Sequence, residues 1–405
     1  MSRRISTRVA ASAGSSSTLS VATPASKRRR KDSGPAPPVA SQSSDSLDAA
    51  KPGSKAERPT SSDVAHCAVM VEVPDGFSLS QAACSYGYYL VPPNLWKPCK
   101  NGTRRKDSGT FSRPLRFGKL LANTARCTIS QVPSSEHAPT SNEADHLAPE
   151  QQGSTALRVD VESAEVLTES DKADIRAQVV RMFQTTIDLE PWHRLSPEAK
   201  KRGYGRLFRS PTVFEDMVKS ITGCNMKFQG TIRMNRLLCE QFGRDQAFPT
   251  PEDLEGVQPE DLKEKAKVGY RADRILKLAQ NFRDGTVDPD WLEAPGRTRE
   301  EVCEYVKNLS GFGAYAAGNV AMLLGFYDEV PLDSETVRHF KDYHGVITKN
   351  VKEVASKATK EYLPFAPYQV RVFVACALLS AAAAATTGCP RGQGETRCAF
   401  DRTNT

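Results

Sequence analysis

The sequence predicts an α+β fold: a mainly α-helical core, a small N-terminal antiparallel β domain and disordered tails. Three observations predict it. Short apolar runs separated by Gly, Pro and Ser occupy residues 63–165, as in small sheets. From residue 166 onward, apolar residues recur at three- and four-residue steps, as in amphipathic helices. Residues 1–62 are rich in Ser, Ala and Pro and contain no aromatic residue, so they bury too little apolar surface to offset the entropy of ordering.

The net charge of +7 is concentrated in this N-terminal tail, because residues 1–60 hold eleven Lys and Arg but only four Asp and Glu. Two targeting signals compete there. Residues 1–26 carry Arg and Ser without an acidic residue, as in a chloroplast or mitochondrial transit peptide. The run KRRRK at residues 27–31 is typical of nuclear import or of nonspecific phosphate contact. A solvated basic tail without a targeting role is the third interpretation. We expect a nuclear protein, with the organelles as the alternative.

The ten cysteines do not indicate a disulfide framework or a metal centre. They are irregularly spaced, no CxxC pair occurs, and the gaps between Cys376, Cys389 and Cys398 fit neither zinc nor iron–sulfur ligation. We therefore expect reduced thiols and no iron–sulfur cluster. The longest run of small apolar residues is too short and too rich in Ala to span a membrane.

Four segments follow from these patterns. We expect a disordered basic tail with a targeting signal at residues 1–62, a small antiparallel β domain at 63–165, a helical domain at 166–379 and a low-complexity tail at 380–405. The β domain contains apolar runs at 67–73, 86–91 and 154–167 and a disordered insertion at 134–153. The helical segments expected from periodicity are 173–183, 211–221, 231–242, 271–282, 298–309, 314–326 and 367–379.

The stretch LSGFG at residues 309–313 predicts a tight turn between two helices. Thr298 and Glu301 form a capping box that starts a helix over about residues 299–309. Gly311 and Gly313 tolerate unusual backbone angles and let a partner approach the chain closely. A second helix starting near Ala314 has free amides at its N-terminus, and a phosphodiester oxygen is the anion that suits them.

Asp333 follows the second helix behind Val330 and Pro331. A helix of about twelve residues that turns back through GFYDEVP returns this aspartate to the mouth of the hairpin. Two interpretations stay open. Asp333 caps a helix that starts at Ser334, or it supplies a carboxylate for chemistry beside the bound phosphate.

These motifs resemble the helix-hairpin-helix motif of the DNA glycosylase superfamily with the Gly/Pro-Asp element (HhH-GPD), in particular its 8-oxoguanine and alkyladenine glycosylase branch. Residues 205–225, 267–280 and 366–379 resemble further segments of that branch. The residues that match the motif are Leu309, Gly311, Phe312, Gly313, Ala317, Val330, Pro331 and Asp333.

The resemblance implies a DNA N-glycosylase of base excision repair that acts, as a monomer, on an oxidised or alkylated purine in damaged double-stranded DNA. It implies that Asp333 is catalytic and stabilises the cationic sugar. The implied DNA-binding residues are Gly311, Phe312 and Gly313 in the hairpin, Asn225 filling the gap in the duplex, Tyr270 as a wedge and Arg271 facing the orphaned base. Tyr315, Gln369 and Phe373 line the implied base pocket. No metal or cofactor is implied, although a structural monovalent cation at the hairpin is compatible with the family.

The sequence departs from this branch at residues that decide mechanism and substrate. Bifunctional members place a lysine where this chain has Tyr315, and a phenol cannot form the imine needed for lyase chemistry, so we expect hydrolysis by water. The alternatives are a glycosylase/lyase that uses Lys307 or Lys341, and a non-catalytic DNA-binding protein. Gly230 replaces an arginine that recognises an opposing cytosine, and Asn319 and Glu335 replace the Cys and His of the base pocket.

Overall fold

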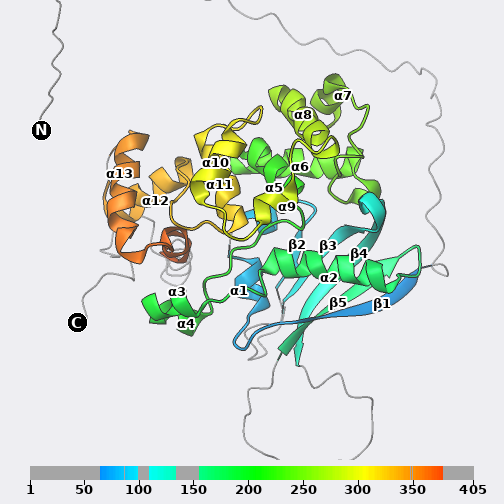
Figure 1. Ribbon diagram of the computed structural model, residues 1–405, viewed down its shortest axis with the longest axis horizontal. Coiled ribbons are helices and arrows are strands. Elements are labelled where there is room, and N and C mark those ends of the chain that lie inside the picture. The colour runs from blue at the N-terminus through cyan, green and yellow to red at the C-terminus, as the bar shows by residue number, and fades with distance from the viewer. Residues whose placement is uncertain are drawn as a thin grey trace, which may run out of the picture. The chain divides into compact units, whose positions relative to one another are not determined.

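The structure, a computed structural model, describes residues 64–85, 87–98, 109–133, 155–346, 348 and 350–376. Five strands form one antiparallel sheet in the order β1-β5-β4-β3-β2 (Figure 1). They are β1 (Ala65–Glu72), β2 (Leu95–Lys97), β3 (Thr110–Phe117), β4 (Asn123–Pro133) and β5 (Thr155–Ser163). Helices dominate the chain after the last strand, so the predicted α+β fold is confirmed.

One face of the sheet is buried because alternate residues along its strands are apolar. Val69 on β1 pairs with Val159 on β5, and Val159 pairs in turn with Ile129 on β4. All three side chains are at most 2% exposed. The helix α2 (Glu169–Phe183) lies across this sheet in Figure 1, and its apolar residues belong to the same buried cluster.

Within the apolar run at residues 86–91, residues 87–91 do not form a strand, contrary to the expectation of a β domain. Gly87–Leu90 forms the short 3-10 helix η1 instead. The Tyr88 ring turns into the interior, where it is 8% exposed, and Pro92 and Pro93 have no backbone N–H to offer to a neighbouring strand.

The helices expected from periodicity are present at the expected places. These are α2, α5 (Val213–Gly223), α6 (Phe228–Phe242), α8 (Ala272–Arg283), α10 (Arg299–Lys307), α11 (Ala314–Leu324) and a helix over 369–376. The other helices are α1 (Leu79–Ala83), α3 (Glu190–Leu195), α4 (Pro197–Arg202), α7 (Pro259–Lys265), α9 (Pro289–Glu293), α12 (Ser334–His344) and α13 (Val351–Tyr362). Short 3-10 helices occur at η2 (Lys119–Leu121), η4 (Arg244–Gln246), η5 (Gly269–Arg271) and η6 (Leu363–Phe365).

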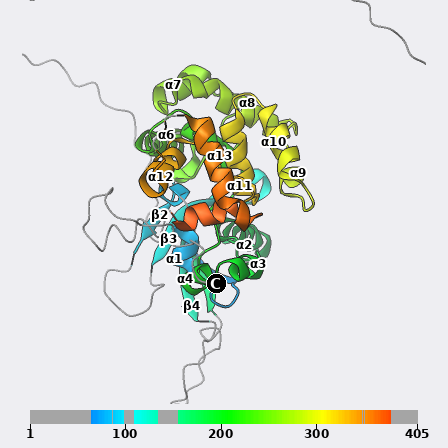
Figure 2. The same ribbon diagram turned by 90° about the vertical axis from the view of Figure 1, so that its left-hand side faces the viewer.

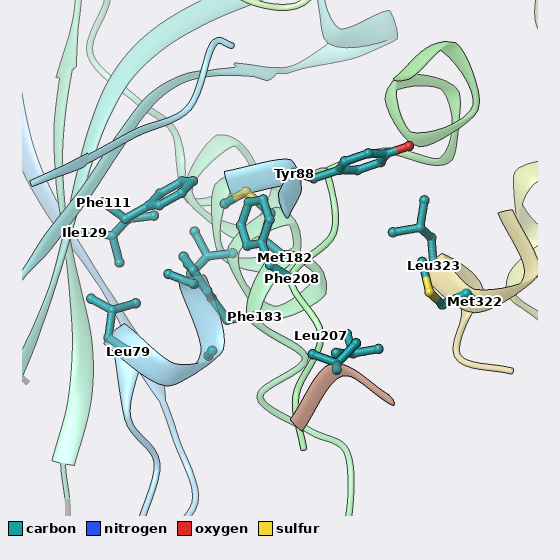
Figure 3. Packing of buried hydrophobic residues seen from close by; sticks show 14 of the residues in the cluster. Leu79, Tyr88, Phe111, Ile129, Met182, Phe183, Leu207, Phe208, Met322 and Leu323 are labelled. Carbon is teal, nitrogen blue, oxygen red and sulfur yellow. The ribbon is translucent and has the colours of Figure 1, made fainter. Parts of the chain in front are cut away.

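Two clusters of buried apolar side chains hold these elements together. The first combines the sheet and α2 with residues of α12, α13 and the helix over 369–376. At its centre Phe111, Phe183 and Phe208 pack with ring centroids between 5.2 and 5.8 Å apart (Figure 3). The second cluster lies among the helices from α5 to α11. The strands therefore share a core with helices from the far end of the described chain.

A buried ion cluster also joins the sheet to α5. Arg113 on β3 places Nη2 2.8 Å from Oε2 of Glu215, and the other oxygen of Glu215 lies 2.7 Å from Nζ of Lys219. Burial alone would raise the pKa of Glu215, but the two adjacent cations outweigh it and lower the pKa to about 2. This cluster fixes α5 against the sheet, with Glu215 as a carboxylate.

Several expectations fall outside the described residues, namely those for the N-terminal tail, the insertion at 134–153 and the tail at 380–405. The division into four segments stays a prediction. Cys67, Cys84, Cys127, Cys224, Cys239 and Cys303 are free thiols, as expected. Cys376 is disulfide-bonded, so the expectation of reduced thiols is wrong at this residue. None of the helices that the structure describes is long and apolar enough to span a bilayer.

Candidate active site

The helices α10 and α11 form the predicted hairpin and lie side by side in both views of the molecule (Figures 1 and 2). The capping box is present, because Thr298 Oγ1 accepts from the amide of Glu301 at 3.2 Å and Glu301 Oε2 accepts from the amide of Thr298 at 2.8 Å. In the turn the amide of Phe312 donates to the carbonyl of Leu309 at 3.2 Å, and the Phe312 side chain is buried. Phe312 therefore anchors the turn from inside.

The two glycines of the turn serve different purposes. Gly311 has φ = 97°, which side chains disfavour, and a Cβ there would lie 2.6 Å from Cδ of Arg274. Gly313 is the N-cap of α11 with ordinary extended angles, and a Cβ there would meet nothing within 4 Å. The fold therefore requires glycine at 311, whereas glycine at 313 leaves open space in front of the first turn of α11.

The chain returns from α11 to the hairpin through an anchored loop. Arg299 on α10 places Nη1 2.6 Å from Oε2 of Glu329, just before Val330 and Pro331. Gly318 on α11 lies against the same segment, since a Cβ at this glycine would be 4.0 Å from Cβ of Pro331. The loop is thereby held against both helices of the hairpin, and Asp333 follows it directly.

Asp333 uses both carboxylate oxygens. Oδ1 accepts from the amide of Thr336 at 2.8 Å and from the Thr336 hydroxyl at 3.0 Å, so Asp333 is the N-cap of α12. Oδ2 accepts from the phenol of Tyr315 at 3.4 Å, a long hydrogen bond. The side chain is half-buried. The two interpretations of this residue are therefore compatible, since one oxygen caps the helix and the other faces the first turn of α11.

Tyr315 is a neutral donor in this arrangement. Burial raises the pKa of its phenol far above the ordinary value, and the nearby Tyr88 and the Asp333 carboxylate raise the pKa further. The phenol therefore keeps its proton and points it at the carboxylate. The structure brings together Tyr315, Asp333 and the hairpin, as the sequence predicted.

A buried polar cluster lies one turn further along α11. The amide of Asn319 donates at 2.9 Å to the phenol oxygen of Tyr88 and at 2.9 Å to Oγ of Ser220. Burial raises the pKa of Tyr88, so this phenol is also neutral. Figure 3 shows the Tyr88 ring extending away from the Phe111 cluster with its oxygen at the far end. Sequence reasoning missed Tyr88 and Ser220, because no local pattern links them to Asn319.

The predicted DNA-contacting residues Asn225 and Tyr270 are brought close together by Arg271. The Arg271 guanidinium is 4.5 Å from the ring centroid of Tyr270, and its Nη2 donates to the carbonyls of Cys224 and Asn225. Asn225 is exposed and Tyr270 is 49% exposed. Arg271 is only 3% exposed, so it holds backbone in this structure, and a contact with an orphaned base stays a prediction.

The two remaining predicted pocket residues lie on the helix over 369–376. Gln369 is half-buried, and its Oε1 is buried without a hydrogen-bond partner among the described residues. The Phe373 ring packs edge-on against His339 of α12 at 5.0 Å between centroids. This contact places Phe373 against α12, and its role in a base pocket stays a prediction. Among the described residues, no three His, Cys, Asp or Glu side chains gather to hold a metal ion.

Comparisons with known proteins identify one recurring fold. No protein-family model matches the sequence. The Schizosaccharomyces pombe "Alkylbase DNA glycosidase-like protein mag2" is 23% identical over 154 residues, which are 38% of this chain and 72% of that protein. The 3-methyladenine DNA-glycosylase structure from Archaeoglobus fulgidus is 17% identical, with a TM-score of 0.51 over 75% of this chain and 95% of the other. The Clostridium acetobutylicum 8-oxoguanine glycosylase/lyase in complex with double-stranded DNA is 14% identical, with a TM-score of 0.52 over 78% and 98%.

Proposed function

We propose that this chain, which has the fold of the helix-hairpin-helix DNA glycosylases, is a DNA N-glycosylase of base excision repair. In this proposal it binds damaged double-stranded DNA and hydrolyses the N-glycosidic bond of a flipped purine that is oxidised or alkylated. The observation that carries the proposal is the position of Asp333, whose Oδ2 lies 3.4 Å from the phenol of Tyr315 at the first turn of α11.

The chemistry follows from the charge of this carboxylate. When the bond from C1′ to the base nitrogen breaks, the electron pair leaves with the base and the sugar becomes a cation. A fixed negative charge in a partly buried site stabilises that cation as it forms. A water molecule then forms the new bond to C1′ and passes its proton to the Asp333 carboxylate or to the departing base. The products are a free base and an abasic sugar.

Base extrusion supplies a role for the exposed residues of the α5–α6 turn. An enzyme cannot reach the glycosidic bond of a stacked base, so the nucleotide leaves the duplex before cleavage. In the proposal, Asn225 fills the resulting gap and Tyr270 acts as a wedge, while the backbone of Gly311, Phe312 and Gly313 binds the phosphate strand. The Oε1 of Gln369, which has no hydrogen-bond partner in the part of the chain that the structure describes, supports a role for that side chain in reading a base.

We assign the enzyme to the monofunctional class. The neutral phenol of Tyr315 cannot form an imine with the sugar. Lys341 lies eight residues along α12 from Asp333, which corresponds to roughly 12 Å of helix rise. Lys307 is exposed in the last turn of α10. Neither lysine is therefore favoured over water as the nucleophile.

One assay tests the proposal against its two rivals. Labelled duplexes that carry a panel of oxidised and alkylated purines are incubated with the protein, and each sample is analysed with and without alkali. Strand breaks that appear only after alkali are the expected result. Breaks without alkali would indicate a glycosylase/lyase, and a gel shift without any break would indicate a DNA-binding protein.

The location, oligomeric state and cofactor requirement belong to the same proposal. We propose a monomer that needs no cofactor and acts on nuclear DNA, with organellar DNA as the alternative. Fusion of residues 1–62 to a fluorescent protein distinguishes the two compartments. Base release that persists in a metal chelator is expected, and its loss would contradict the absence of a cofactor.

A further inference from the structure

Two buried arginines have no carboxylate to balance their charge. Arg371 on the helix over 369–376 is 5% exposed, and Arg206 in the segment between α4 and α5 is 8% exposed. Neither guanidinium forms an ion pair with an Asp or Glu in the part of the chain that the structure describes. Burying a charge is costly unless an opposite charge compensates it. The two arginines therefore point to an anion that the described residues do not supply.

Tyr327 and Gln184 connect the two arginines. The Arg371 guanidinium lies 4.5 Å from the ring centroid of Tyr327. The Tyr327 hydroxyl donates to Oε1 of Gln184 at 3.0 Å, and the backbone carbonyl of Gln184 accepts from Nη1 of Arg206 at 2.6 Å. Burial and, next, the positive charge of Arg371 lower the pKa of Arg206 to about 10. The two guanidiniums are therefore close enough for their charges to interact.

The donors of the two guanidiniums are used differently. Nη1 of Arg206 donates to the carbonyls of Gln184 and Ile187 at 2.6 and 3.2 Å. In contrast, Nε and Nη1 of Arg371 are buried and have no hydrogen-bond partner among the described residues. A buried charged donor without an acceptor carries its full desolvation cost. These two atoms of Arg371 therefore mark the place that suits an acceptor from solution.

Two other buried arginines show how such a charge is usually satisfied in this protein. Arg113 places Nη2 2.8 Å from a carboxylate oxygen of Glu215. Arg271 has no carboxylate partner, but its Nε and Nη2 donate to backbone carbonyls. Neither solution is used at Nε and Nη1 of Arg371 in the described chain, so this guanidinium is the one that is left to bind an anion.

Aromatic rings surround the Arg371 guanidinium and leave its edge for an acceptor. The ring centroids of Tyr327 and Tyr368 lie 4.5 and 5.0 Å from it, and Tyr368 packs on Trp192 at 5.9 Å between centroids. Rings stack on the faces of a guanidinium, whereas its N–H groups point outward in its plane and match the oxygens of a phosphate or a carboxylate. Tyr327 is buried but Tyr368 is only half-buried, so solvent lies on the side of Tyr368.

We propose that Arg371 and Arg206 bind a free oxyanion of the size of phosphate, which enters beside Tyr368. The oxyanion accepts from Nε and Nη1 of Arg371 and offsets the charge of both guanidiniums. It thereby joins the helix over 369–376 to the segment that precedes α5. The site uses none of the residues proposed to contact DNA or the sugar, so this inference does not rest on the proposed function.

The test compares inorganic phosphate with chloride on the full-length protein. Melting temperatures are measured by differential scanning fluorimetry in sodium phosphate and in sodium chloride of equal ionic strength and pH. An anion that binds only the folded protein raises its melting temperature, and we expect phosphate to raise that of the wild type by about 3 °C or more relative to chloride. Equal melting temperatures in the two salts would overturn the proposal.

Variants separate binding at this site from the general stabilising effect of phosphate on folded proteins. Arg371→Met replaces an unpaired buried charge by an apolar side chain, so we expect it to fold and to lose most of the phosphate-specific increase. Arg206→Met is the second variant and is expected to lose at least half of the increase. Retention of the full increase by both variants would overturn the proposal.

Two control variants locate the site. Arg209→Met removes an arginine whose Nη1 already lies 3.1 Å from a carboxylate oxygen of Glu293, and it is expected to keep the increase. Gly313→Leu changes the hairpin, where the proposed DNA phosphates bind, and it is also expected to keep the increase. Loss of the increase in Gly313→Leu would place the phosphate at the hairpin and would overturn the assignment to Arg371 and Arg206.

Discussion

Asp333 has a structural role and, in the proposed mechanism, a chemical one, because its two oxygens face different elements. Oδ1 caps α12 through Thr336, and Oδ2 faces Tyr315 on α11. The cap fixes the direction of the carboxylate, so the charge is positioned before any substrate arrives. Preorganised charge of this kind stabilises a transition state without reorganisation.

The substitution Asp333→Asn removes the negative charge of the side chain but keeps the N-cap of α12. Asparagine is as good an N-cap as aspartate, so we expect the melting temperature to change little. Without the negative charge the cationic sugar loses its stabilisation, and we expect single-turnover base release to fall by about 100-fold or more. Duplex affinity should change less than threefold, because the phosphate contacts that we propose lie in the hairpin. Equal losses of binding and turnover would contradict this separation of roles.

Tyr315→Lys tests the position of residue 315 relative to the sugar. An amine beside Asp333 is expected to attack C1′ as the bond to the base breaks and the base leaves, and opening of the sugar ring then gives a covalent imine. The measurement is trapping of a protein–DNA adduct with borohydride, together with strand breaks that appear without alkali. Tyr315→Phe is the control and is expected to give neither. Failure to trap an adduct with a folded Tyr315→Lys protein would place residue 315 away from the reacting carbon.

The residues of the site divide into those that sequence could predict and those that it could not. The positions of Asp333 and Tyr315 beside the hairpin were predictable because both residues follow the hairpin glycines closely, in a recognisable order. Tyr88 bonds to Asn319 across 231 residues, and no periodicity or local motif reports such a contact. The resemblance implies that Arg271 faces an orphaned base, which stays a prediction, while in the structure Arg271 is buried and donates to backbone carbonyls that no local motif reports.

At the scale of elements, we expect the two glycines of the hairpin turn to differ in their effects, Gly311 on stability and Gly313 on DNA affinity. Gly311→Ala forces a side chain into a left-handed conformation against Arg274, and we expect it to destabilise the protein by about 1–3 kcal/mol. Gly313→Leu places a side chain in open space at an extended position, so we expect a loss of less than about 1 kcal/mol. Urea denaturation measures both effects.

For correctly folded protein, we expect Gly313→Leu to weaken duplex affinity more than Gly311→Ala does. In the proposed complex the phosphate strand approaches residue 313, so we expect the Kd of Gly313→Leu for duplex DNA to rise by tenfold or more. Comparable destabilisation by both variants, or unchanged affinity for Gly313→Leu, would show that the two glycines share one purpose.

The helix α12 contains a histidine that makes stability depend on pH. Burial, with smaller contributions from His344 and Arg338, lowers the pKa of His339 to about 4. The unfolded chain binds this proton near pH 6.5, whereas the folded chain does not bind it until about pH 4. Stability from this residue is therefore complete above pH 6.5 and is lost as the pH falls toward 4.

His339→Gln removes this titration. We expect wild-type protein to lose about 2 kcal/mol more stability than the variant between pH 7 and pH 4.5. Thermal melts of both proteins at each pH provide the measurement, and the difference between them cancels the contributions of other acidic groups. Parallel pH profiles would show that His339 is protonated in the folded protein.

The helices and strands were predictable where the apolar residues follow a single helical or strand period. Helices such as α10 and α11 show apolar steps and capping signals, and their starts at Arg299 and Ala314 agree with the expectation. The expectation from the apolar run at 86–91 was wrong for residues 87–90, which form η1, and the Tyr88 side chain reaches Asn319 on α11. Tertiary contacts override local propensity at such positions.

At the scale of the whole molecule, sheet and helices depend on each other. The first apolar cluster joins strand residues to α12, α13 and the helix over 369–376. Arg113 connects β3 to α5 through Glu215, and α5 in turn carries Ser220, which bonds to Asn319 near the site. The sheet therefore positions the helix against which α11 packs.

Arg113→Met tests this dependence. The substitution leaves Glu215 buried with Lys219 as its remaining partner, and we expect a loss of about 3 kcal/mol in the free energy of unfolding. Arg126→Met on β4, where the arginine is exposed, is the matched control and should change stability by less than about 0.5 kcal/mol. Because one core spans the strands and the last helices, Arg113→Met should shift a single denaturation transition detected equally by circular dichroism and tryptophan fluorescence. Two separate transitions would show that the sheet and the helices fold independently, and the sheet would then have no part in positioning Asp333.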